Sequence, residues 1–166
     1  MGDAQWGAVR EEVALPLAGM HVYGSAAALY VAPERGRNGD ALVRLEIALK
    51  KGRSANTFDW EHKIAVQLTL RELPVFVCVL YGWVPRLDWN NRGKDHVKSI
   101  RMEHQKTHLY LTIREAADSA AIQISPPDAF RVSTLCVAQL RQNFPGVDAQ
   151  EMLTSLRNTV GRMMAG

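Results

Sequence analysis

The chain has 166 residues, of which 47% are hydrophobic and 22% charged, and its net charge is +3 at pH 7. This length and composition are typical of one globular domain with its own hydrophobic core. The sequence contains no apolar run near the roughly 18 residues that a membrane-spanning helix needs, so we expect no membrane-embedded segment.

The positive charge is concentrated in the middle of the chain. Residues 44–114 carry 13 Lys or Arg against 7 Asp or Glu, whereas residues 1–43 and 115–166 are both slightly acidic. A cationic middle segment is expected if one surface of the protein binds a polyanion. The alternative is an ordinary solvated charged face.

The cysteines and the first residues indicate the compartment. Cys78 and Cys136 both lie in apolar helical runs, which predicts buried free thiols in a reducing environment and argues against a disulfide framework or a zinc site. The acidic Asp3, Glu11 and Glu12 fit neither a secretory signal nor an Arg-rich transit peptide. We therefore expect a cytoplasmic, nucleoid-associated protein.

Three segments are expected along the chain: an N-terminal extension (1–20), a central domain (21–146) and a C-terminal amphipathic helix (147–166). The extension contains a short predicted helix that begins at Asp3. Residues 21–33 are small and apolar on both faces, which predicts a strand that is buried on both sides or pressed against another subunit.

Two predicted strands flank a basic loop in the first half of the central domain. Apolar and polar residues alternate over 42–49, as in a strand with one buried face. The polar loop 50–57 follows, with three cations in its first four residues. A second strand is predicted over 58–68, and its alternation places Trp60 on the same buried face as Ile64.

The remaining elements repeat the order of strands followed by a helix. Thr69 and Glu72 form a capping box that opens an apolar helix over 70–81, and residues 83–96 are expected to be irregular. Further strands are predicted at about 97–103, 107–114 and 119–124, before a proline-initiated helix over 126–143 and the final amphipathic helix. The sequence thus predicts an α+β fold with two antiparallel β-sheets, each followed by a helix, and an extra C-terminal helix.

A basic turn that carries aromatic residues at the lip of a sheet is suited to binding a single nucleic-acid strand, because cations neutralise phosphates and rings stack on bases. The candidate phosphate contacts are Lys50, Lys51, Arg53, Lys63, Arg92, Lys94 and Arg101. The candidate stacking side chains are Tyr30, Phe58, Trp89 and Tyr110, with His108 beside Tyr110 on the outer face of its strand and Trp60 as a weaker candidate. For Trp89, the alternative is a ring that covers the end of the core.

The sequence contains no motif that predicts catalysis. A phosphate-binding glycine loop, a nucleophile elbow and a His-Glu-x-x-His pair are all missing. His62 stands beside Asp59 and Glu61, but neighbouring residues of a strand point to opposite faces, so we expect the two acids to pair with cations on adjacent strands. We expect no enzyme activity, no metal and no cofactor.

Three stretches resemble the Whirly family of single-stranded-DNA-binding proteins, which is related to the positive-cofactor-four transcriptional coactivators. Residues 23–33, a small-residue strand ending in a proline, resemble the family's Lys-Gly-Lys-Ala-Ala-Leu-Ser-Val signature. Phe58-Asp59-Trp60 and the following strand and helix start resemble its Tyr-Asp-Trp strand, and residues 97–103 with the elements after them resemble its second half. The resemblance covers residues 21–143.

The resemblance implies two four-stranded antiparallel sheets, each with a helix, in a homotetramer that binds single strands along its sheet edges. Two features depart from the family pattern. Ser25 and Ala26 stand where the signature has its lysines, and the segment between Pro33 and Ala41 is shorter than in the plant proteins, which suggests one strand fewer. The missing transit peptide suggests a bacterial, phage or mobile-element relative.

The sequence leads to one main hypothesis, which is a homo-oligomeric protein that binds single-stranded DNA with little sequence preference. Binding to RNA or to duplex DNA is an alternative. Another is a transcriptional regulator on the same scaffold, which recruits a protein partner through its C-terminal helix. The last alternative is a protein that only forms assemblies and has no affinity for oligonucleotides.

Overall fold

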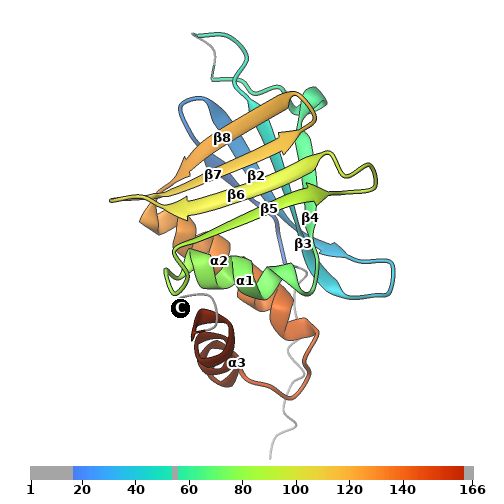
Figure 1. Cartoon of the computed structure of the whole chain (residues 1–166), viewed down its shortest axis with the longest axis vertical. Helices are drawn as coiled ribbons and strands as arrows, with labels where there is room; N and C mark the ends of the chain where they lie inside the picture. Colours follow the sequence, from blue (N-terminus) through green and yellow to red (C-terminus); the bar gives the residue numbers. More distant parts are fainter. Residues whose placement is uncertain (1–16, 54–55, 163–166) are drawn as a thin grey trace, which may run out of the picture.

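Two four-stranded antiparallel sheets form the frame of the protein (Figure 1). The structure, a computed structural model, describes residues 17–53 and 56–162, so the helix expected in the N-terminal extension lies outside the described residues. Sheet 1 consists of β1 (Met20–Tyr23), β2 (Ala27–Arg35), β3 (Ala41–Leu49) and β4 (Ile64–Leu68), and sheet 2 of β5 (Arg86–Arg92), β6 (Lys98–His104), β7 (Leu109–Glu115) and β8 (Asp118–Ile124). Neighbouring strands follow one another along the chain in both sheets.

A helix follows each sheet, which confirms the predicted fold class. Helix α1 (Glu72–Leu80) follows sheet 1, α2 (Pro126–Gln142) follows sheet 2, and α3 (Ala149–Leu156) continues into a short π-helix, η2 (Arg157–Gly161). The predicted capping box before α1 is present, since the Glu72 carboxylate accepts from the Thr69 amide at 2.9 Å and the Thr69 hydroxyl from the Glu72 amide at 3.3 Å.

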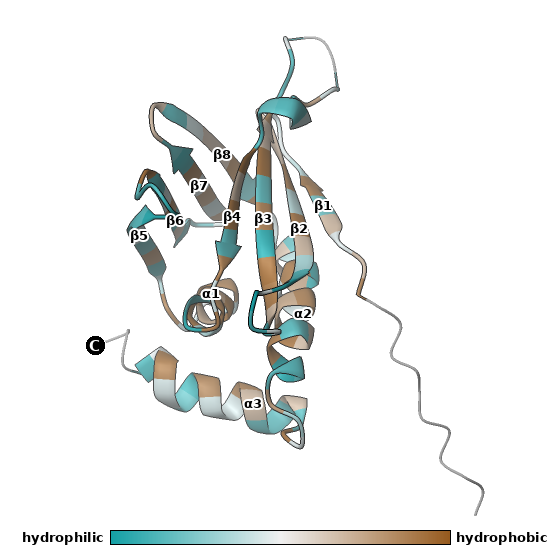
Figure 2. Cartoon of the chain, turned by 90° about the vertical axis from the view of Figure 1, so that its right-hand side faces the viewer, coloured by the Kyte–Doolittle hydropathy of each residue, from teal (hydrophilic) through white to brown (hydrophobic). Residues whose placement is uncertain are grey.

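One continuous core joins the two sheets and the helices. The alternating apolar residues of both sheets are buried, and α1 and α2 pack against each other and against β5 and β3. Figure 2 shows the sheets as separate layers, with α1 and α2 across their lower ends and α3 beneath α1. The apolar residues Met152 and Leu156 of α3 are buried in this core, so the helix packs on its own domain.

Both cysteines are buried free thiols, as predicted. Cys78 lies in α1 and Cys136 in α2. Burial raises the pKa of the Cys78 thiol to about 11 and raises the pKa of Cys136 as well. Both groups are therefore protonated thiols and weak nucleophiles at neutral pH.

The expected single strand over 21–33 is wrong, because the chain turns at residues 24–26 and forms β1 and β2. The Gly24 amide donates to the Ala27 carbonyl at 2.9 Å and closes the turn. The extra strand also restores sheet 1 to four strands, so the suggestion of a missing strand is wrong too. The small residues serve two purposes here, as Gly24 allows a tight turn and Ala27 and Ala28 are fully buried on opposite faces of β2.

Gly24 also allows the two sheets to approach each other. A Cβ atom at this position would lie 2.9 Å from Cγ1 of Ile122 on β8 and 3.2 Å from the Ala27 carbonyl oxygen. We expect Gly24→Ala to lower the free energy of unfolding by about 1–3 kcal/mol, because the added atom forces sheet 1 and sheet 2 apart. Urea denaturation followed by circular dichroism measures this, with the exposed neighbour Ser25→Ala as the control. Equal stability of the two variants would contradict the close packing.

Two further expectations about strands are wrong. The strand predicted over 58–68 begins only at Ile64, since Trp60–His62 form a 3-10 turn and Phe58 makes an isolated bridge with Lys50. Residues 83–96, expected to be irregular, contain β5, which is an edge strand. Its alternation is hard to recognise because Asp and Asn, which are rare in strands, occupy its solvent side.

Candidate nucleic-acid interface

Five aromatic side chains gather on the outer face of sheet 1. We call this group the aromatic cluster: His21, Tyr23, Tyr30, Phe58 and Trp60. The ring of His21 stacks on those of Tyr30 and Tyr23, with centroids 4.6 and 5.7 Å away, and meets Trp60 edge-on at 5.5 Å. The rings of Tyr23 and Phe58 are 5.8 Å apart. The cluster is therefore one connected set of rings on a solvent-facing surface.

Strand register and short side chains build this cluster. His21 lies opposite Tyr30 on β2, which places the two rings side by side on one face. Tyr23 shares its row across the sheet with Ala28 and Ala48, whose methyl groups leave room for a ring to lie over the sheet. Both alanines are almost completely buried although they point to the outer face.

The 3-10 turn after the basic loop supplies the other two rings. Phe58 is held beside Lys50 by the bridge between their backbones, and the Asp59 amide donates to the Leu49 carbonyl at 2.8 Å. The turn then directs Trp60 toward His21 instead of into the core beside Ile64, so the predicted burial of Trp60 with that strand face is wrong. Trp60 remains half-buried.

Exposure identifies the ring that is most open to a ligand. The side chain of Tyr23 is 65% exposed, whereas Tyr30, Phe58 and Trp60 are half-buried. His21 is exposed as well. Stacking needs an open ring face, so Tyr23 is the first candidate for contact with a base.

The basic loop lies at the same end of sheet 1 as the cluster. Lys50 follows β3 directly and is bridged to Phe58, and Lys51 and Arg53 are exposed just beyond it. In the part of the chain that the structure describes, none of these three cations is in an ion pair, as the bridges there involve other Lys and Arg residues. The structure thus places the predicted phosphate contacts of the basic loop next to Phe58, a predicted stacking residue of the aromatic cluster.

Lys63 and its neighbour Arg44 are instead engaged with a buried acid. Glu46 is 5% exposed on the outer face of sheet 1, in the same row as Tyr30. Its carboxylate lies 2.9 Å from the Lys63 ammonium and 3.0 Å from Nε of Arg44. Two cations on this side of sheet 1 are therefore already neutralised.

The outer face of sheet 2 carries a second group of predicted residues. Tyr110, Arg101 and Thr112 line a groove of about 410 Å³ there, together with Arg114. Tyr110 also lines a cleft of about 560 Å³ between the sheets, whose other walls include Tyr23 and His108. The cleft joins the aromatic cluster to the outer face of sheet 2, and we call it the intersheet cleft.

Three predicted residues lie apart from this surface, on β5 and the hairpin after it. The Arg92 guanidinium pairs with the Glu72 carboxylate and donates to the Gln67 carbonyl at 2.9 Å, which ties β5 to the start of α1. It also lies over the Trp89 ring, 5.9 Å from the centroid, and that ring packs against the core. Lys94 is exposed in the hairpin. Because β5 is the edge of sheet 2 farthest from β8, the structure does not bring this group to the aromatic cluster.

Two members of the cluster were missed in the sequence. His21 and Tyr23 alternate with Val22, as on a strand with a polar outer face, but the small residues that follow them predict one strand over the whole of residues 21–33. The pairing of His21 with Tyr30 depends on the turn at Gly24, which fixes the register. With that turn recognised, the alternation would have placed His21, Tyr23 and Tyr30 on the same face.

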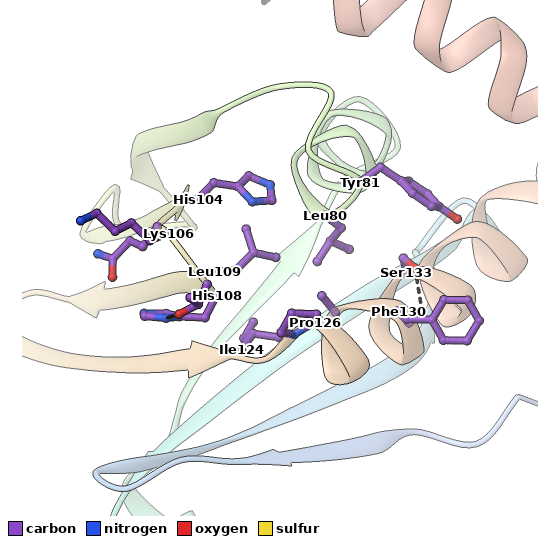
Figure 3. A pocket seen from close by; sticks show the side chains of 13 residues that line it. Leu80, Tyr81, His104, Lys106, His108, Leu109, Ile124, Pro126, Phe130 and Ser133 are labelled. Atoms are coloured by element: carbon purple, nitrogen blue, oxygen red, sulfur yellow. Dashed lines mark hydrogen bonds between the residues drawn. The ribbon is translucent and has the colours of Figure 1, made fainter.

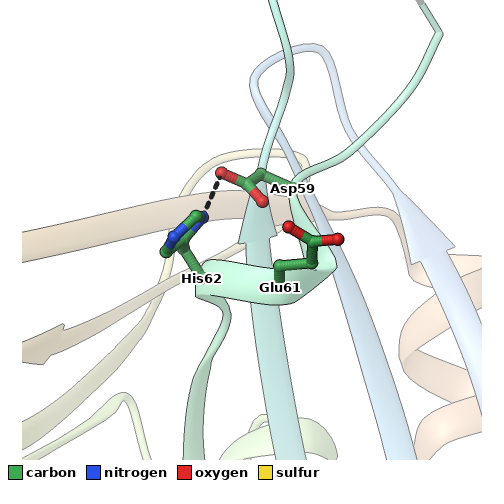
Figure 4. Close-up of side chains that lie close together, drawn as sticks. All are labelled: Asp59, Glu61 and His62. Atoms are coloured by element: carbon green, nitrogen blue, oxygen red, sulfur yellow. Dashed lines mark hydrogen bonds and ion pairs between the residues drawn. The ribbon is translucent and has the colours of Figure 1, made fainter.

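Asp59, Glu61 and His62 come together in the 3-10 turn (Figure 4). The expectation that their side chains diverge is wrong, because it assumed a strand. Asp59 and His62 are three residues apart on one side of the turn, and Nδ1 of His62 lies 2.9 Å from the Asp59 carboxylate. The hydrogen bond from His62 lowers the pKa of Asp59, with a smaller effect from the Lys51 charge. One ligand atom from each of the three lies within 4.8 Å of the others, a spacing that a divalent cation accepts, although all three are at the surface.

A further cavity, of about 660 Å³, lies at the β6–β7 hairpin (Figure 3). Apolar side chains from α1, β7 and β8 form its floor, and His104, Lys106 and His108 lie at one end. Phe130, which is 68% exposed, and Tyr81, which is 37% exposed, lie at the other end.

In the described residues, no helix has the length and apolar character to span a membrane.

Comparison with known proteins supports the fold. No protein-family model and no curated protein matches the sequence. Among solved structures, WHY3 from Arabidopsis thaliana is similar with a TM-score of 0.57 at 17% identity, over 75% of this chain and 86% of that one. The plant transcriptional regulator PBF-2 gives 0.58 at 16% identity, over 80% and 91%. WHY1 from Arabidopsis thaliana gives 0.57 at 20% identity, over 74% and 88%. The chain has the fold of the Whirly proteins, as the sequence resemblance predicted.

Proposed function

We propose that the protein binds single-stranded DNA, with little sequence preference, on the outer face of sheet 1. The observation that carries the proposal is the aromatic cluster beside a loop of unpaired cations. Rings stack on any base and cations attract any phosphate, so this combination favours unpaired strands without reading a particular sequence. A duplex would keep its base faces stacked on each other and out of reach of Tyr23.

The strand follows a path set by the shape of the surface. Its phosphates contact Lys50, Lys51 and Arg53, and its bases reach Tyr23 at the edge of the cluster. From there the intersheet cleft leads to Tyr110 on sheet 2, where Arg114 is available to a further phosphate and Arg101 is already paired with the Glu103 carboxylate at 3.2 Å. Of the residues on this path, Lys50, Lys51, Arg53 and Tyr110 are predicted from the sequence, whereas Tyr23 and Arg114 are added by the structure. The path leaves out the group on β5.

A second candidate is a transcriptional regulator on the same scaffold, which one of the similar structures favours because PBF-2 is a plant transcriptional regulator. Such a regulator would bind DNA in the same way and would also recruit a protein partner through α3. Since Met152 and Leu156 of α3 face the domain, the partner would contact the polar side of the helix. Deletion of residues 147–166 would then abolish recruitment.

We further propose that the protein acts as a homotetramer, without enzyme activity, in association with the nucleoid. The exposed Phe130 and Tyr81 beside the cavity at the β6–β7 hairpin offer an apolar surface to another subunit. Sedimentation equilibrium measures the mass of the assembly directly. A monomer at micromolar concentration would contradict the tetramer.

Competition titrations test the proposed function. A labelled single-stranded oligonucleotide is displaced by unlabelled single-stranded DNA, duplex DNA or RNA of equal length. We expect single strands to compete far better than duplex. We also expect the logarithm of the affinity to fall with the logarithm of the salt concentration, with a slope of about −0.7 for each phosphate contact. Equal competition by duplex, or binding that does not respond to salt, would contradict the proposal.

A further inference from the structure

A separate basic groove lies where the end of the chain packs on α1. Helix α1 ends at Leu80, and Gly82, two residues later, adopts a left-handed conformation with φ of +76°. The Trp83 amide donates back to the Cys78 carbonyl at 3.0 Å, as in a Schellman motif. This turn places Trp83 beside Tyr81, with stacked rings whose centroids are 4.8 Å apart.

The π-helix η2 brings two arginines to the same side of the chain. In a π-helix the hydrogen bonds join residues five apart, so Arg157 and Arg162 lie one wide turn from each other. Both line a groove of about 570 Å³ with Trp83, and a Cβ atom added at Gly161 would lie 3.5 Å from the Cβ atom of Trp83. We call this site the Trp83 groove: Trp83, Thr154, Arg157, Asn158, Gly161 and Arg162.

The groove is lined by hydrogen-bond donors and contains no carboxylate among its described residues. Neither arginine is in an ion pair with another described residue, although such pairs hold Arg92 and Arg131 elsewhere. The Arg157 guanidinium lies over the Trp83 ring, 5.9 Å from its centroid, a cation–π contact that leaves its N–H groups available. The hydroxyl of Thr154 and the amide of Asn158 add two neutral donors.

We propose that the Trp83 groove binds the phosphate group of a small phosphorylated ligand. Two guanidinium groups match the geometry of phosphate oxygens, because each can donate two parallel hydrogen bonds. The volume is within the range of small-molecule sites and is sufficient for a nucleotide. The site goes beyond the proposed DNA binding, since α3 and η2 lie on the side of α1 that faces away from the sheets (Figures 1 and 2).

Calorimetric titration of the full-length protein at low salt tests the site. The probes are inorganic phosphate, AMP and ATP, which distinguish free phosphate from a phosphate ester. We expect saturable binding of one ligand per chain, and we expect Arg162→Gln to weaken it about tenfold through loss of a charge-assisted hydrogen bond. Arg141→Gln is the matched control, because Arg141 is an exposed arginine at the end of α2 that does not line the groove.

Three outcomes would overturn the inference. One is that no probe binds at millimolar concentration, and another is that Arg141→Gln weakens binding as much as Arg162→Gln. The third concerns a 5′-phosphorylated oligonucleotide: if Arg162→Gln weakens its binding as much as that of ATP, the groove belongs to the DNA strand. Unchanged oligonucleotide binding by Arg162→Gln supports an independent site. If the proposed DNA binding is wrong, the wild-type protein will instead bind no oligonucleotide at all.

Discussion

Replacing Tyr23 with Ala should weaken binding of single-stranded DNA by about 1–3 kcal/mol, which corresponds to a loss of roughly 5- to 150-fold in affinity. The side chain of Tyr23 is 65% exposed and stands where sheet 1 meets the intersheet cleft. A strand that passes from one sheet to the other has to cross this position. Fluorescence anisotropy with a labelled oligonucleotide measures the change.

The conservative variant separates stacking from hydrogen bonding. Tyr23→Phe keeps the ring and should retain nearly all of the affinity, because a base stacks on the ring face and not on the hydroxyl. Phe144→Ala removes a ring that is 45% exposed between α2 and α3, outside the cluster, and should have no effect. If Tyr23→Ala binds like the wild-type protein, or if Phe144→Ala loses as much, the aromatic cluster is not the site.

Stability has to be measured with these variants, since Tyr23 also stacks on His21 and contacts Phe58. An exposed position contributes little to the core, so we expect the midpoint of thermal unfolding to change by only a few degrees. The loss of affinity should therefore remain when binding is measured well below the unfolding transition. A loss that disappears on cooling would indicate partial unfolding instead.

Most of the fold could be predicted from the sequence, because it follows from local signals. The capping box before α1, the Pro126 helix start and the alternation on β3 and β7 each depend on residues within one turn or one strand. The turn at Gly24 and the edge strand β5 were missed. The turn at Gly24 lacks the Asn-Gly or Asp-Gly pair that is typical of a tight hairpin turn. Strand β5 has Asp and Asn on its solvent-facing side, a composition typical of a loop.

The site was harder to predict than the fold, because it depends on register and on tertiary pairing. The residues Tyr30, Phe58 and Trp60 were identified by type, but only the paired strands show that His21 lies between two of them. The partners of Arg92 and Lys63 are 20 and 17 residues away along the chain, and no local pattern shows that these cations are already engaged. Residue type predicts what a side chain can do, whereas its partners decide whether it is available.

Glu46 provides a test in which binding should become stronger. Its carboxylate neutralises Lys63 and contributes to holding Arg44, whose other partner is Glu34 at 3.3 Å. We expect Glu46→Gln to bind single-stranded DNA about three- to tenfold more tightly at low salt, because Lys63 is released to a phosphate and a buried negative charge beside the rings is removed. The salt dependence should become steeper by about 0.7 for that one added contact.

The size of this effect depends on the cost of breaking the ion pairs. The side chains of Arg44 and Lys63 are 41% and 39% exposed, whereas that of Glu46 is 6% exposed. Water therefore solvates both cations once the pairs are lost, and the uncharged amide of Gln leaves no unpaired charge buried, so we expect Glu46→Gln to destabilise the fold by only about 1 kcal/mol. The double variant Glu46→Gln/Lys63→Gln isolates the lysine, since it should return the salt dependence to that of the wild-type protein. Glu34→Gln is the matched control, because it removes one of the two acid partners of Arg44 and leaves Lys63 paired with Glu46. If Glu46→Gln leaves affinity and salt dependence unchanged, phosphates do not pass over this face of sheet 1, and the strand has to follow the basic loop alone.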